Sequence, residues 1–212
     1  MEQAKRIAVV TGGNKGIGLE ICRQLASNGT MVILTARDEK RGLETVENLK
    51  ACGLSHILFH QLEVTDQASI ASMADFIKNK FGKLDILVVL NEKAKKELSD
   101  TDSLTEEKVE EVLKRYLEDL KEDLLETKGW PVNFSAYIMS KAALNAYTRV
   151  LAKKYPNIAI NAVSPGFVKT DLNHHRGILT VEQGAKGPVM LALLPNGGPS
   201  GLFYDQMEVS TF

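Results

Sequence analysis

Two residues with reactive side chains stand four positions apart in the segment Tyr137-Ile138-Met139-Ser140-Lys141. If this segment is helical, both side chains lie on one face, so the Lys141 ammonium can lie near the Tyr137 phenol. A free tyrosine has a pKa of about 10, and a nearby positive charge favours its phenolate form. The pair is therefore suited to donate a proton to a carbonyl that receives a hydride. The spacing is common, however, and without other signals it is usually an accident of two surface residues.

A glycine-rich turn near the start of the chain provides such a signal. Residues 9–18 read V-V-T-G-G-N-K-G-I-G and lead from an apolar strand into a helix. A diphosphate needs backbone N–H groups free of side chains at the positive end of a helix dipole, and Gly12, Gly16 and Gly18 suit that need. The alternative is an ordinary strand-to-helix turn. The predicted cofactor contacts in this turn are Thr11, Gly12, Asn14, Lys15, Gly16, Ile17 and Gly18.

The elements that position these residues alternate between apolar strands and amphipathic helices, as in a parallel α/β sheet. Strands are predicted at residues 6–11, 31–35, 57–64, 84–90, 158–163 and 202–204. Helices are predicted at residues 17–28, 39–51, 68–81, 135–155 and 181–193. The run 84–90 is continuously apolar, as expected for a strand covered on both faces.

A charge-rich insert occupies residues 91–129 and becomes helical from about Thr105. Ser103 and Glu106 have capping-box spacing, which predicts the start of that helix. Trp130 and Pro131 follow the insert, and two roles fit them equally: lining a hydrophobic substrate pocket or anchoring the core.

Composition limits the classes of protein to which the chain can belong. With 212 residues and 44% hydrophobic content, it is expected to form a single domain, residues 1–212. The net charge of −1 argues against nucleic acid as a partner. No apolar run is long enough to span a bilayer, and we expect no signal peptide at the N-terminus. The two cysteines are expected to be reduced thiols of a cytoplasmic protein, and His174-His175 has no partner at metal-ligand spacing.

The motif T-G-x-x-x-G-x-G, together with Y-x-x-x-K, resembles the short-chain dehydrogenase/reductase family. Within it the chain is similar to plant reductases of the neomenthol dehydrogenase and salutaridine reductase type, which are relatives of monomeric carbonyl reductases. The resemblance covers residues 6–88 and 91–212. It implies a Rossmann-like, doubly wound parallel sheet flanked by helices. It also implies a monomer that reduces a hydrophobic ketone or aldehyde, with the insert as a helical cap over the pocket.

The resemblance assigns further roles. Lys141 would also bind the nicotinamide ribose, Glu63 and Val64 would contact the adenine, and a turn that contains Pro165, Gly166, Val168 and Thr170 would close the cofactor site near the carboxamide. An NAD site usually has an acidic residue at the end of the second strand, whereas this chain has Arg37 there. Arg37 and Lys15 favour a 2′-phosphate, hence NADP(H), although Asp38 follows directly and both cations suit an ordinary surface.

One part of the family pattern is missing. The resemblance implies an Asn-Asn-Ala-Gly segment after the fourth strand, then a helix and a central strand that carries a catalytic serine, and none of these is present. We assign no catalytic serine; losing one oxyanion donor typically costs ~10²–10³ in rate. We expect the sheet to close the gap by pairing strand 158–163 with strand 84–90. Three hypotheses follow: an NADP(H)-dependent reductase, a catalytically impaired cofactor-binding homologue, or a poorly folding product.

Overall fold

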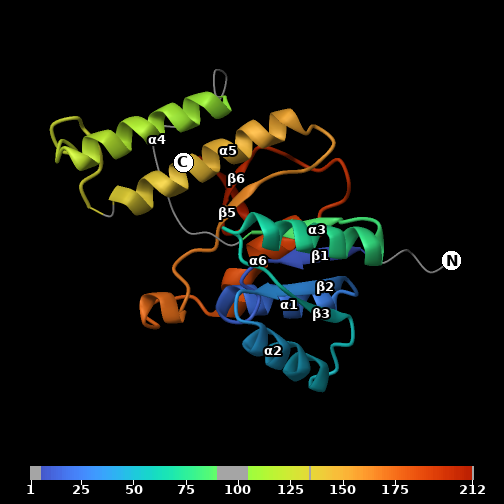
Figure 1. Ribbon diagram of the computed structural model, residues 1–212. Helices are drawn as coiled ribbons and strands as arrows, with labels where there is room; N and C mark the ends of the chain where they lie inside the picture. The colour runs from blue at the N-terminus through green and yellow to red at the C-terminus, as the bar shows by residue number, and fades with distance from the viewer. Residues whose placement is uncertain (1–5, 90–104, 134, 212) are drawn as a thin grey trace. The chain divides into compact units, whose positions relative to one another are not determined.

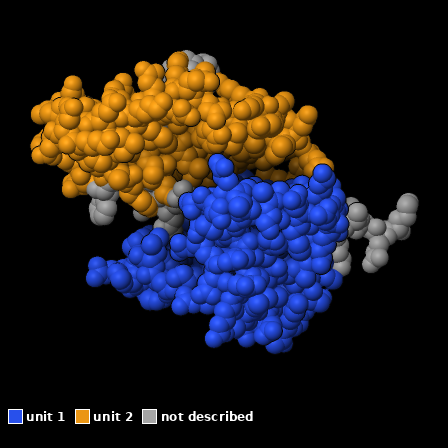
Figure 2. All heavy atoms as spheres, in the orientation of Figure 1, with its two compact units in different colours: residues 1–90, 165–193 blue, residues 91–164, 194–212 orange. Residues whose placement is uncertain are grey.

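A computed structural model describes residues 6–89, 105–133 and 135–211 of the chain. The chain divides into two compact units, residues 1–90 with 165–193 (unit 1) and residues 91–164 with 194–212 (unit 2), which are coloured separately in Figure 2. The prediction of a single domain over residues 1–212 therefore stays a prediction.

Unit 1 is built on a four-stranded sheet whose strands are all parallel. The strands are β1 (Ile7–Val10), β2 (Met31–Ala36), β3 (Ile57–Gln61) and β4 (Ile86–Val88), in the order β3-β2-β1-β4. The chain thus builds the sheet outward from β1 in one direction and then returns to place β4 on the other side of β1. This sheet with flanking helices confirms the predicted Rossmann-like fold.

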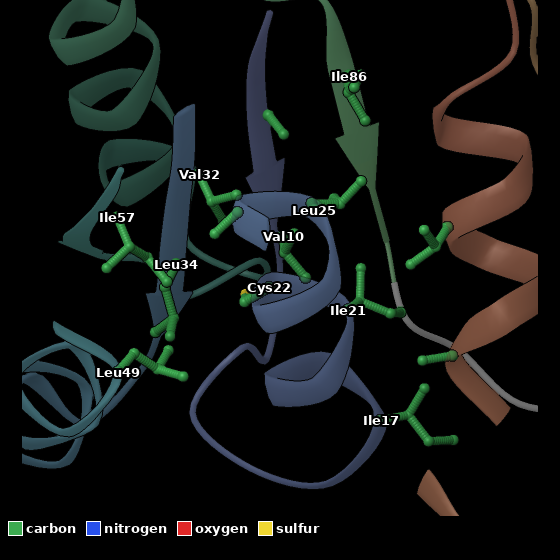
Figure 3. Packing of buried hydrophobic residues seen from close by; sticks show 14 of the residues in the cluster. Val10, Ile17, Ile21, Cys22, Leu25, Val32, Leu34, Leu49, Ile57 and Ile86 are labelled. Atoms are coloured by element: carbon green, nitrogen blue, oxygen red, sulfur yellow. The ribbon is translucent and has the colours of Figure 1, made fainter. Parts of the chain in front are cut away.

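Helices cover both faces of this sheet. On one face, α1 (Gly16–Ser27), α2 (Glu39–Ala51) and α6 (Val181–Ala192) contribute to a core in which Ile21, Leu25 and Leu34 are fully buried (Figure 3). On the other face lies α3 (Gln67–Phe81) (Figure 1). It contributes Met73 to a smaller core with Val9 and Ile33. Alternate residues of each strand point to opposite faces, which explains the two cores.

Unit 2 combines two long helices with a small sheet. The helices are α4 (Glu106–Lys121) and α5 (Ser135–Lys154), which pack through Val109 and Ala146 among others. The sheet contains β5 (Ala162–Ser164), β6 (Phe203–Asp205) and β7 (Glu208–Ser210), with β5 parallel and β7 antiparallel to β6. Among the described residues, no helix has the length and apolar content needed to cross a membrane.

The predicted closure of the sheet is wrong. β5 pairs with β6 in the three-stranded sheet, and β4 pairs with β1 at the edge of the four-stranded one. The prediction that the 84–90 strand is covered on both faces is also wrong, because Leu87 and Val89 are 60% and 57% exposed. Thr105 is the N-cap of α4, with its hydroxyl accepting from the N–H of Lys108. The predicted cap residue Ser103 and residues 91–104 of the insert lie outside the described residues.

Candidate functional site

The candidate cofactor site lies at the carboxyl ends of the parallel strands of unit 1. The glycine turn follows β1, Arg37 follows β2, and Glu63 and Val64 follow β3. Strand order reverses at β1, which has β2 on one side and β4 on the other. In open α/β sheets, ligands bind outside the carboxyl ends of the strands at such a switch point. The sheet therefore brings these predicted contacts to the edge where a nucleotide would bind.

Three glycines shape the turn in different ways. Gly12 and Gly16 have φ of 59° and 55°, a left-handed conformation that glycine adopts without strain. Gly13 has an ordinary φ, but a Cβ there would lie 2.8 Å from Leu34 Cγ and 2.9 Å from Cys22 Sγ. Gly13 is thus the residue that lets the turn pack against the core. The sequence analysis singled out Gly12, Gly16 and Gly18 and missed Gly13, although the doublet Gly12-Gly13 is visible in the sequence.

The N-terminus of α1 differs from the other helix starts of unit 1. Asp38 caps α2, Asp66 caps α3 and Thr180 caps α6, each through a side-chain oxygen that accepts a backbone N–H. The α1 cap residue, Lys15, makes no side-chain cap hydrogen bond, and the first turn of α1 contains no acidic residue. The first N–H groups of α1 therefore remain available to an anion, at the positive end of the helix dipole.

The segment after residue 165 packs against this turn. A Cβ on Gly16 would lie 3.7 Å from Thr170 Cγ2, and a cleft of about 220 Å³ is lined by Gly16, Lys169, Thr170 and Asp171, among others. One of the predicted cofactor contacts in this segment, Val168, has a side chain that is not available to a cofactor. Val168 is 3% exposed, with its side chain in the core against Gly184, so only its backbone remains for a nicotinamide.

Each basic residue predicted to meet a 2′-phosphate has a carboxylate beside it. Arg37 Nε lies 3.8 Å from Glu63 Oε2, and Lys15 Nζ lies 3.0 Å from Asp171 Oδ2. The hydrogen bond and charge of Lys15, with the charge of His175, lower the pKa of Asp171. Sequence reasoning missed Asp171, because nothing in the local pattern indicates that it faces a residue 156 positions away.

The predicted catalytic pair lies in unit 2, on the first turns of α5. Lys141 Nζ lies over the Tyr137 ring, 5.7 Å from its centre, so the ammonium lies near the face of the aromatic ring. Lys141 is 5% exposed, which is unusual for lysine. The meeting of this pair with the glycine turn of unit 1 stays a prediction.

Trp130 is a core residue. It is 5% exposed, donates its indole N–H to Asp119 Oδ2 at 2.7 Å, and meets the Tyr116 ring edge to face at 5.5 Å between centroids. Tyr116 in turn donates to Ser135 Oγ at 2.9 Å. Of the two roles left open for Trp130, the structure favours the anchor between α4 and α5.

Matches to family models and to known proteins show to which family this chain belongs. A family model described as short chain dehydrogenase matches residues 6–118, and a second, described as Enoyl-(Acyl carrier protein) reductase, matches residues 124–187. The chain is 42% identical to (+)-neomenthol dehydrogenase of Arabidopsis thaliana, over 100% of the chain and 99% of the relative. The chain belongs to the short-chain dehydrogenase family.

Two further members of the short-chain dehydrogenase family show the range of similarity. The structure of salutaridine reductase from Papaver somniferum superposes with a TM-score of 0.89 at 38% identity, covering 94% of this chain and 99% of that one. Carbonyl reductase [NADPH] 3 of Mus musculus is 34% identical, over 92% of this chain and 93% of the relative.

The alignment also shows that this family member is shorter than its relative. The comparison with the Arabidopsis relative extends over 294 positions, whereas this chain has 212 residues, so at least 82 positions contain no residue of this chain. The chain nevertheless reaches both ends of the relative. Residues are therefore absent from within the alignment.

Proposed function

We propose that this chain binds NADP(H) at the carboxyl-end edge of unit 1 and reduces a hydrophobic ketone or aldehyde to an alcohol. The observation that carries the proposal is the N-terminus of α1, which has neither a side-chain cap nor an acidic first turn and lies at the strand-order reversal. The names of similar family members, which include reductases and one carbonyl reductase marked NADPH, support the same activity.

We assign the binding roles in unit 1 as the glycine motif and the family resemblance imply. Backbone N–H groups at Gly16, Ile17 and Gly18 hold the diphosphate, because this helix end offers donors and a positive dipole. Arg37 and Lys15 attract the 2′-phosphate. Further along the same edge, Glu63 and Val64 meet the adenine, and Pro165, Gly166, Val168 and Thr170 meet the nicotinamide carboxamide.

The chemical roles belong to α5. When bound, NADPH supplies the hydride that the substrate carbon receives. Tyr137 donates its phenolic proton to the carbonyl oxygen, and the adjacent Lys141 ammonium stabilises the phenolate that remains. Lys141 also holds the nicotinamide ribose hydroxyls. The helical cap, α4, covers the hydrophobic substrate.

A second candidate function is a cofactor-binding homologue with little turnover. It is favoured by the 82 or more alignment positions that have no residue here. It is also favoured because the described residues between β4 and α5 contain no strand that ends in serine. One missing oxyanion donor alone lowers the rate ~10²–10³-fold, which still leaves a measurable enzyme. Greater loss would indicate that Tyr137 and the nicotinamide do not meet.

Turnover with a panel of hydrophobic ketones separates the two functions. NADPH oxidation by the wild-type chain is compared with that by Tyr137→Phe, and Tyr147→Phe on the same helix is the matched control. A reductase loses its activity in Tyr137→Phe and keeps it in Tyr147→Phe. Equal rates in all three proteins would refute the role of Tyr137, and NADPH binding without any turnover would favour the second function.

We propose further that the protein is a monomer of the cytoplasm. The described cysteines are both free thiols, Cys22 buried and Cys52 exposed, which supports a reducing compartment. Light scattering after size exclusion tests the oligomeric state. A mass twice that of the 23.3 kDa chain would contradict the monomer.

A further inference from the structure

The segment that follows Val168 is held in a fixed turn by its own hydrogen bonds. Asn173 donates to the Val168 carbonyl at 2.8 Å and accepts from the Thr170 N–H at 3.2 Å, around the short 3-10 helix Asp171–Asn173. The next two residues, His174 and His175, have φ of 52° and 59°, a conformation that costs energy for residues other than glycine. These hydrogen bonds therefore restrict the backbone of Asp171 to one conformation.

Close packing against Gly177 also fixes this turn. A Cβ on Gly177 would lie 2.2 Å from the carbonyl carbon of Val168 and 2.3 Å from the Lys169 nitrogen, so only glycine permits this approach. The Thr170 side chain of the same turn lies against Gly16. These contacts hold the Asp171 carboxylate next to the glycine turn.

The Asp171 carboxylate has a basic side chain beside each of its oxygens. Lys15 Nζ lies 3.0 Å from Oδ2, and His175 Nε2 lies 3.3 Å from Oδ1. The Lys15 and Asp171 side chains are 66% and 61% exposed, so a dissolved anion can reach the ammonium. Lys15 is also one of the two cations assigned to the 2′-phosphate.

We propose that Asp171 is a specificity-determining residue: its carboxylate competes with the 2′-phosphate of NADP(H) for Lys15 and thereby reduces the preference for NADPH over NADH. This inference rests on the proposed NADP(H) binding. A lysine ammonium is a compact point charge, and moving it to the phosphate requires breaking the contact with Asp171. Exposed ion pairs contribute about 0.2–1 kcal/mol, equivalent to roughly 1.4- to 5-fold in an equilibrium constant.

Titration of the full chain with NADPH and with NADH, followed by nucleotide fluorescence, tests the proposal in four variants. Asp171→Asn removes the competing charge, Lys15→Met removes the cation, and the double variant measures their coupling. Asp75→Asn, exposed on α3, makes the same change of charge elsewhere on unit 1.

The expected result is that Asp171→Asn binds NADPH about two- to fivefold more tightly, with NADH unchanged. In the Lys15→Met background, Asp171→Asn should have no further effect, and Asp75→Asn should match the wild type. Equal tightening for both nucleotides, unchanged binding or weaker binding in Asp171→Asn would each overturn the proposal. If the wild-type chain binds no NADPH at all, the proposed function itself fails.

Discussion

Gly13 is the residue of the glycine turn that depends most directly on the core. Its neighbours Leu34 and Cys22 are fully buried and leave no room for a methyl group. A clash of this kind costs about 1–3 kcal/mol, because a packed interior yields little. We predict that Gly13→Ala lowers the free energy of unfolding by that amount in urea denaturation.

The matched comparison for this prediction is Gly12→Ala. A Cβ on Gly12 meets nothing within 4 Å, so only its φ of 59° resists substitution. Left-handed backbone costs an alanine roughly 1–2 kcal/mol. If Gly13→Ala is as stable as the wild type, the packing assigned to Gly13 is incorrect.

Asp85 links the starts of β1 and β4. Its Oδ2 accepts from the Ile7 N–H at 2.7 Å, and its own N–H donates to the Ile7 carbonyl at 3.0 Å. Burial raises the pKa of Asp85. Hydrogen bonds from Lys83 and Ile7, together with the charges of Lys83 and Arg6, lower this pKa by more than burial raises it, so the net pKa is below its usual value.

A carboxyl with a lowered folded pKa stabilises the protein above its unfolded pKa, about 3.9, and loses that effect as the pH falls through the folded value. We predict that Asp85→Asn is less stable than the wild type by about 1 kcal/mol at pH 7, and that the difference shrinks below about pH 4. Urea denaturation at both pH values measures it, with Asp75→Asn as control. A difference independent of pH would show that the charge of Asp85 is irrelevant.

At the scale of elements, Trp130 anchors α4 to α5. Trp130→Phe keeps an aromatic ring but loses the hydrogen bond to Asp119 and some buried area. We predict a loss of about 1–2 kcal/mol in the free energy of unfolding, with the KM for any ketone substrate unchanged. A large rise in KM at unchanged stability would instead indicate that Trp130 lines the substrate pocket.

Local signals allowed most elements to be predicted. The start of α2 after Asp38, the stop of α3 at Gly82 and the apolar periodicity of α4 are all properties of neighbouring residues. Strand β7 was missed, β5 is shorter than the strand predicted at residues 158–163, and the pairing of β5 with β6 was not predicted. These features depend on contacts between residues that are distant in sequence. For the same reason the glycine turn could be recognised from its motif, whereas the contact between Lys15 and Asp171 could not.

At the scale of the whole molecule, the feature to test is the position of β4 at the edge of the four-stranded sheet. Among the described residues, β4 pairs with β1 alone, while β1 pairs with both β2 and β4. We predict that amide hydrogens of β4 exchange faster than those of β1, because an edge strand has N–H groups that face water. Hydrogen exchange with mass spectrometry measures this. Equal protection would mean that another segment pairs with β4 and that the edge assignment is wrong.

The central claim is that unit 1 holds the phosphates of NADP(H), and calorimetric titration of the full chain with NADPH tests it most directly. We predict saturable binding of one nucleotide per chain, tighter for NADPH than for NADH. Arg37→Ala should weaken NADPH binding about tenfold or more, as loss of a charge-assisted contact does. Lys50→Ala at the far end of α2 should not. No heat of binding with NADPH, or an Arg37→Ala variant that binds as the wild type does, would contradict the account.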